Sequence, residues 1–74
     1  MRIMLFGSIA EIACASEVDL EASSVDRLRE LLILHVPKLR DMRYAIAVDR
    51  RIIADDLDLN GSEEIAVLPP FAGG

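Results

Sequence analysis

The sequence predicts an α+β domain in which a mixed sheet of about five strands curves around one main helix. Short apolar or alternating stretches, typical of strands, occur near both ends and in the middle of the chain. One amphipathic segment with three- and four-residue spacing lies between them. Seventy-four residues suffice for a single domain, and 53% of them are hydrophobic, with no Trp, one Tyr and two Phe. The core must therefore be aliphatic.

The first stretch, residues 1–6, is apolar at five of its six positions and is closed by Gly7 and Ser8. Such an apolar strand is best placed in the middle of a sheet, with the final strand beside it. Residues 9–15 are short for a helix and favour a single turn. Residues 18–22 alternate apolar with acidic side chains, the period of a strand with one solvated face.

The main helix is expected to start after a serine cap. Ser23 and Ser24 are both suitable N-caps, and Ser23 with Asp26 approximates a capping box. The helix ends before Pro37, after about three turns. Its apolar positions recur on one side: Val25, Leu28, Leu32 and Val36.

The middle of the chain predicts a hairpin. Residues 37–43 form a polar connection after the helix. Residues 44–48 then predict a strand, residues 49–51 a turn, and residues 52–54 a short returning strand.

The last third of the chain leads into the final strand. Residues 55–59 predict a loop with a single helical turn, and Asn60-Gly61 is a strong turn signal. Residues 64–68 predict the last strand, which Pro69-Pro70 stops because proline cannot donate to a ladder. Together the elements predict the β-grasp, ubiquitin-like fold, with a domain over residues 1–68 and an extended, flexible tail over residues 69–74.

The tail is the most informative feature of the sequence. The chain ends Pro69-Pro70-Phe71-Ala72-Gly73-Gly74. The two glycines form the thinnest strand a polypeptide can offer, and they carry an α-carboxylate whose pKa is roughly 3.3–3.7. Six residues extend about 20 Å, and the two prolines, with φ fixed near −65°, form a stiff base. We therefore expect Gly74 to react inside a narrow channel of another protein.

The remaining composition excludes several functions. A net charge of −5 argues against nucleic acid as a partner. The single cysteine, Cys14, fits a reducing compartment and is expected to be a small, partly buried filler. No apolar run approaches the length of a membrane span, so we expect a soluble cytoplasmic chain. His35 and the acidic side chains lack the spacing of a metal site, and no catalytic triad or phosphate loop is present.

The residues that carry a family resemblance lie at both ends. Residues 59–74, LNGSEEIAVLPPFAGG, resemble the C-terminus of the MoaD/ThiS family of ubiquitin-like sulfur carriers, and the Pro-Pro-x-x-Gly-Gly ending is typical of MoaD, the small subunit of molybdopterin synthase. Residues 3–7 and 9–12 are similar to the opening strand and first turn of that family. Leu68 stands where an aromatic residue is often found in the family, and Ala10 where an arginine is.

The resemblance implies a carrier that is not an enzyme on its own. An E1-like (MoeB-like) enzyme would use ATP to adenylate Gly74, and sulfur would then replace AMP to give a thiocarboxylate. The tail, Pro69 to Gly74, would deliver this sulfur to a cyclic pterin in the large (MoaE-like) subunit of molybdopterin synthase. The carrier itself would bind no cofactor and no metal. We expect Phe6, Leu68 and Phe71, the apolar residues near the tail, to form the partner interface.

Two alternatives remain open. The chain could carry sulfur for another pathway, such as thiazole, amino-acid or tRNA thiolation. It could also be a covalent protein modifier, with Gly74 joined to a lysine of another protein. Lys38 is the only lysine of the chain, so conjugation of the protein to itself would be limited.

Overall fold

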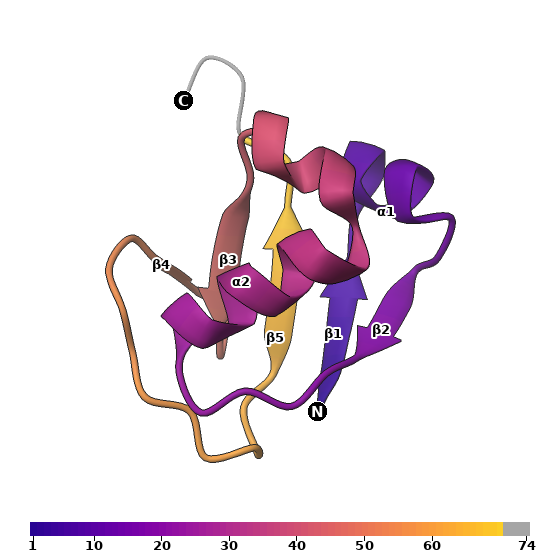
Figure 1. Cartoon of the computed structure of the whole chain (residues 1–74). Coiled ribbons are helices and arrows are strands. Elements are labelled where there is room, and N and C mark those ends of the chain that lie inside the picture. The colour runs from indigo at the N-terminus through magenta and orange to yellow at the C-terminus, as the bar shows by residue number, and fades with distance from the viewer. Residues whose placement is uncertain (71–74) are drawn as a thin grey trace.

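The computed structural model describes residues 1–70, which form a five-stranded mixed sheet with helices packed on it (Figure 1). The sheet order is β2-β1-β5-β3-β4, with β1 and β5 parallel and the other neighbours antiparallel. This is the β-grasp arrangement that the sequence predicts. The elements are β1 (Arg2–Leu5), α1 (Gly7–Ala13), β2 (Glu17–Asp19), α2 (Val25–His35), the 3₁₀ helix η1 (Pro37–Asp41), β3 (Ala45–Val48), β4 (Arg51–Ile53) and β5 (Ile65–Leu68).

The neighbouring interior strands β1 and β5 come from opposite ends of the chain. In the β1–β5 pair, Ile3 lies beside Ile65 and Leu5 beside Val67. Ile3, Ile65 and Val67 have no solvent exposure, and Leu5 has 3%. In the strand order, β5 is the central strand and β1 is the interior strand beside it. Both are covered by α2, which crosses one face of the sheet (Figure 1).

The helix α2 supplies the other half of the core. It presents Val25, Leu28 and Leu32 to the sheet, each with 0% exposure, as its three- and four-residue spacing predicts. The other apolar side chains of the core come from every part of the chain: Ile3, Leu5, Ile9, Val36, Leu39, Ile46, Val48, Leu59, Ile65 and Val67. Within residues 1–70, this core contains no buried polar or charged residue.

The start of α2 differs from the predicted capping box. Ser24, not Ser23, is the N-cap, and its hydroxyl accepts a hydrogen bond from the backbone N–H of Arg27 at 3.1 Å. The carbonyl of Ser23 instead accepts from Leu59 at 2.9 Å. A second cap comes from far along the chain, because the Asp56 carboxylate accepts from the backbone N–H of Asp26 at 2.9 Å. The hydrogen bonds from Leu59 to Ser23 and from Asp26 to Asp56 therefore favour Ser24 as the N-cap of α2.

The same pairing removes the helical turn predicted over residues 55–59. This segment is extended and runs antiparallel to the chain before α2, with a bridge between Ser24 and Asp58. The backbone N–H of Val25 donates to the Leu57 carbonyl at 2.9 Å. Leu59, 8% exposed, joins the core. Burying Leu59 and satisfying the backbone at the start of α2 outweigh the weak local preference for a turn.

Two other segments are more regular than predicted. Residues 7–13 form the seven-residue helix α1 instead of a single turn, because Ile9 is fully buried against the sheet. The polar connection after α2 contains η1, which places Leu39 in the core at 1% exposure.

Between β3 and β4 the turn is only two residues, Asp49 and Arg50, whose φ values of 50° and 69° suit a tight hairpin.

The core predicts a large difference between two leucines of the same helix. Leu28→Ala should lower the free energy of unfolding by about 2–5 kcal/mol, because it opens a cavity beneath α2. Leu34 is 72% exposed, so Leu34→Ala should change the free energy of unfolding by no more than about 0.5 kcal/mol. Urea denaturation of the two variants measures both values, and the helix-propensity change is the same in each. Equal losses would contradict the placement of α2.

Candidate functional site

The candidate site is the end of β5, where the predicted tail begins. On one side Val67 pairs with Leu5 of β1, and on the other Leu68 pairs with Ala45 of β3. Beyond the end of β1, the backbone N–H of Phe6 still donates to the Val67 carbonyl at 3.1 Å. The strand is therefore held from both sides up to the residue before Pro69. The last residues of β5 are therefore hydrogen-bonded to β1 on one side and to β3 on the other.

The start of β5 is fixed as firmly as its end. The Glu63 carboxylate accepts hydrogen bonds from the backbone N–H groups of Asn60, at 2.8 Å to Oε2, and Gly61, at 2.9 Å to Oε1. Hydrogen bonding from Asn60 is the main cause that holds the pKa of Glu63 below its ordinary value. Gly61 has φ of +99°, which glycine adopts readily. This turn lies before β5, at the end of the strand that is farther from the tail.

Phe6 and Leu68 lie together on the sheet face that α2 does not cover. Alternation along β1 and β5 turns Leu5 and Val67 toward the core, so Phe6 and Leu68 face the other way. Phe6 is 45% exposed and Leu68 is half-buried. With their neighbours on this face they form an apolar surface, here called the outer strip: Met4, Phe6, Ala45, Ala66 and Leu68.

The outer strip is suited to contact with another protein. The short side chains of Ala45 and Ala66 leave the backbone of β3 and β5 close to the surface. The larger side chain of Phe6 is exposed on the same face. Large apolar side chains that remain exposed on a small domain often mark an interaction surface. The third residue of the predicted interface, Phe71, lies outside the described residues, as do Ala72, Gly73 and Gly74. Their roles remain predictions.

The charge beside this end of the sheet is positive, although the chain carries −5. Lys38 and Arg40 are exposed on η1, and Arg43 is exposed two residues before Ala45, the partner of Leu68. Within residues 1–70 none of these three cations forms an ion pair. The ion pairs there instead involve Arg2, Arg27, Arg29, Arg50 and the N-terminal amine.

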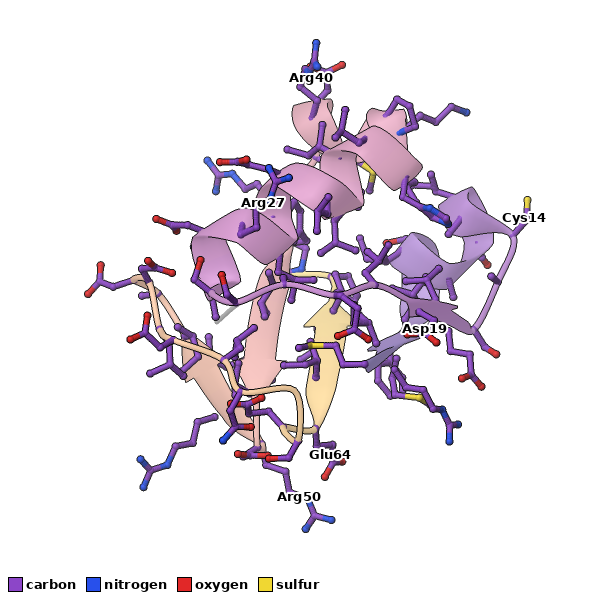
Figure 2. All side chains as sticks on the ribbon, turned by 60° about the horizontal axis from the view of Figure 1, so that its bottom comes forward. Cys14, Asp19, Arg27, Arg40, Arg50 and Glu64 are labelled. Atoms are coloured by element: carbon purple, nitrogen blue, oxygen red, sulfur yellow. The ribbon has the colours of Figure 1, made fainter. Side chains whose placement is uncertain are left out.

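Other reactive groups lie away from the tail base. Cys14 is exposed, so the prediction that it is a partly buried filler is wrong. It ends α1 in the left-handed conformation, with φ of 57°, and its side chain points away from the domain (Figure 2). In the part of the chain that the structure describes, no three His, Cys, Asp or Glu side chains gather as a metal site would require. His35 is exposed in the last turn of α2.

A shallow hollow of about 370 Å³ lies at the opposite end of β1 and β5 from the tail. It is lined by Met1, Arg2, Met4, Gly61, Glu63, Glu64 and Ile65. These residues include no Ser, Cys, His or Lys side chain. Within residues 1–70, no helix has both the length and the apolar character needed to cross a membrane.

Comparisons with solved structures agree on the fold. The small archaeal modifier protein 1 of Methanosarcina acetivorans has a TM-score of 0.81 at 22% identity, over 99% of this chain and 94% of that one. The corresponding protein of Haloferax volcanii scores 0.74 at 22% identity, over 99% and 97%. A Pyrococcus furiosus protein assigned as molybdopterin converting factor, subunit 1, scores 0.80 at 20% identity, over 95% of each chain.

The family comparison is the more specific finding. The model of the ThiS family matches residues 3–74, which is all of the chain except its first two residues and extends through the last glycine. The match and the β-grasp fold agree with the resemblance seen at both ends of the sequence. This chain therefore belongs to the ThiS family of small, ubiquitin-like sulfur carriers.

Proposed function

We propose that this protein is a sulfur carrier of molybdenum cofactor biosynthesis, acting as the small subunit of molybdopterin synthase. The observation that carries the proposal is the Pro69-Pro70-x-x-Gly73-Gly74 ending on a β5 strand that is hydrogen-bonded on both sides. The family match extends through that ending. The Pyrococcus furiosus neighbour, which is named as molybdopterin converting factor, subunit 1, supports the same pathway.

The proposed chemistry takes place at the carboxylate of Gly74. An adenylating enzyme joins it to the AMP part of ATP and releases pyrophosphate. The terminal sulfur of a persulfide attacks the acyl carbon, and AMP leaves. A thiol then cleaves the sulfur–sulfur bond, so that a thiocarboxylate remains on Gly74 and a disulfide on the donor. At neutral pH the thiocarboxylate is an anionic nucleophile, whereas a free cysteine with pKa near 8.5 is only a few per cent thiolate.

The domain contributes placement and not catalysis. Glycine at positions 73 and 74 allows close approach of another protein's backbone. Ordering a free residue costs roughly 1–2 kcal/mol in backbone entropy, and the fixed φ of Pro69 and Pro70 reduces that cost when the tail enters a channel. The outer strip provides binding energy, since burying Phe6 is worth about 1.5–3 kcal/mol. Catalytic side chains and the pterin pocket lie in the large subunit.

The partners follow from this division of labour. We infer two: an E1-like adenylating enzyme and the large catalytic subunit of molybdopterin synthase. Both must grip the same tail, so both cover the outer strip around Phe6 and Leu68. Lys38, Arg40 and Arg43 beside it favour a partner surface with an acidic margin.

Protein modification is the second candidate. It is favoured by the two solved neighbours that are named as small archaeal modifier proteins. The first step, adenylation of Gly74, is the same, but the acceptor is a lysine amine of another protein. Carriage of sulfur to a different acceptor, in thiazole, amino-acid or tRNA thiolation, also shares that step. The acceptor therefore decides among the candidates.

The first functional prediction is that Gly74 receives the sulfur. Incubation with the activating enzyme, ATP and a persulfide donor should increase the intact mass by one sulfur-for-oxygen replacement. Deleting Gly74 should abolish the increase, while the thermal unfolding midpoint stays unchanged because the core ends at β5. Equal thiolation of the truncated and intact chains would refute the tail as the reacting group.

The acceptor is tested with the thiolated product of that reaction. Addition of the large synthase subunit and cyclic pterin monophosphate should return the mass to that of the carboxylate and form the dithiolene product. Loss of sulfur only to another acceptor, or conjugation to lysines of other proteins, would move the assignment to one of the two alternatives.

The second functional prediction is that the two partners compete for the outer strip. Titrating the large subunit into a preformed complex with the adenylating enzyme should displace that enzyme, as followed by size-exclusion chromatography. Phe6→Asp should weaken both complexes at least tenfold, because it places a charge at an apolar contact. Leu34→Asp, on the exposed side of α2, is the matched control and should bind normally. A stable ternary complex on one carrier would contradict a shared surface.

A further inference from the structure

The ring of Pro69 lies against the bare backbone of Gly7, at the start of α1. A Cβ atom placed on Gly7 would be 3.1 Å from Cγ of Pro69 and 3.5 Å from its Cδ. Carbon atoms are in optimal contact at about 3.5–4.0 Å. Any side chain at position 7 would therefore push the proline ring by a few tenths of an ångström.

The Gly7 side of this contact is held in place. The backbone N–H of Phe6 donates to the Val67 carbonyl, and the Phe6 carbonyl accepts from Ile9 at 3.1 Å. The corner between β1 and α1 is thus tied both to β5 and to the first turn of the helix. Moving this corner to accommodate a side chain at position 7 would therefore strain those hydrogen bonds.

The backbone of Gly7 imposes the same choice of residue. Its φ is +55°, in the left-handed region that residues with a Cβ adopt at a penalty. Gly61, with φ of +99°, also has a backbone conformation that residues with a Cβ rarely adopt, but a Cβ there would touch nothing within 4 Å. The two glycines therefore separate backbone strain from contact with the tail.

We propose that Gly7 is a positioning residue for the C-terminal tail. Its lack of a side chain lets the Pro69 ring rest on the corner between β1 and α1, and this contact sets the direction in which the tail leaves the sheet. Because φ of proline is fixed near −65°, a displaced ring turns the chain that follows instead of absorbing the change. The inference rests on the proposed function, since the direction matters only for delivery into a partner.

Gly7→Ala tests the inference, with Gly61→Ala as the matched control. Both variants should remain folded, each with some loss of thermal stability, which is measured alongside the rate. Only Gly7→Ala should reduce kcat/KM for thiolation by the activating enzyme, by roughly 10- to 100-fold, the range expected when a reacting group is misplaced by about 1 Å. Equal rates for the two variants would overturn the positioning role.

A second substitution identifies the contact as the cause. Pro69→Ala removes the ring carbons that a Cβ at position 7 would meet. Adding it to Gly7→Ala should therefore give a smaller loss of kcat/KM than the product of the two single losses. Fully multiplicative losses would show that Gly7 acts on thiolation without Pro69, and would also overturn the proposal.

The geometry has its own readout, which does not depend on sulfur transfer. In the parent chain, NMR should show a nuclear Overhauser effect between the Hα protons of Gly7 and the Hγ protons of Pro69. If the parent chain is not thiolated at all, the proposed function fails. The Gly7–Pro69 contact is then tested by this NMR signal alone. Its presence supports the contact, and its absence refutes the contact.

Discussion

The parallel pairing of β1 with β5 is the interaction on which the rest of the structure depends. It joins the two ends of the chain at the centre of the sheet and buries Ile3, Leu5, Ile65 and Val67 beneath α2. Closing so long a loop costs only slightly more entropy than closing a shorter one, so the buried area can offset it. The same pairing brings Phe6 next to Leu68 and the Gly7 corner next to Pro69. Folding thus builds the base of the tail.

The proposed function divides the chain between the described domain and the C-terminal end. In that proposal the domain supplies the binding surface, while the chemistry belongs to the terminal carboxylate and to the partner proteins. The outer strip and the cations of residues 38–43 border the same end of the sheet. Partners that recognise this region would contact the base of the tail at Pro69 and Pro70. Specificity for one sulfur acceptor would then lie in the partner and not in the carrier.

Much of the fold could be predicted from local sequence patterns. The spacing of Val25, Leu28 and Leu32 identified α2, and the apolar first and last strands identified the centre of the sheet. Apart from the exposure of Cys14, the main errors occur where distant segments meet. Leu59 and Asp56 pair with the start of α2, which replaced both the expected helical turn and the Ser23 cap. For the candidate site, Phe6 and Leu68 were named from sequence, and their role in an interface stays a prediction. The Gly7–Pro69 contact requires a register that no local pattern contains.

The central claim is that another protein reads the tail as bare backbone, and Gly73→Val tests it most directly. Valine adds a branched side chain and disfavours φ values that glycine permits. The measurement is the rate of sulfur transfer to the tail by the activating enzyme, with thermal unfolding of the same sample. The account predicts an unchanged unfolding midpoint and a steep fall in rate. A variant that unfolds normally and accepts sulfur at the parent rate would contradict a narrow channel and the carrier function built on it.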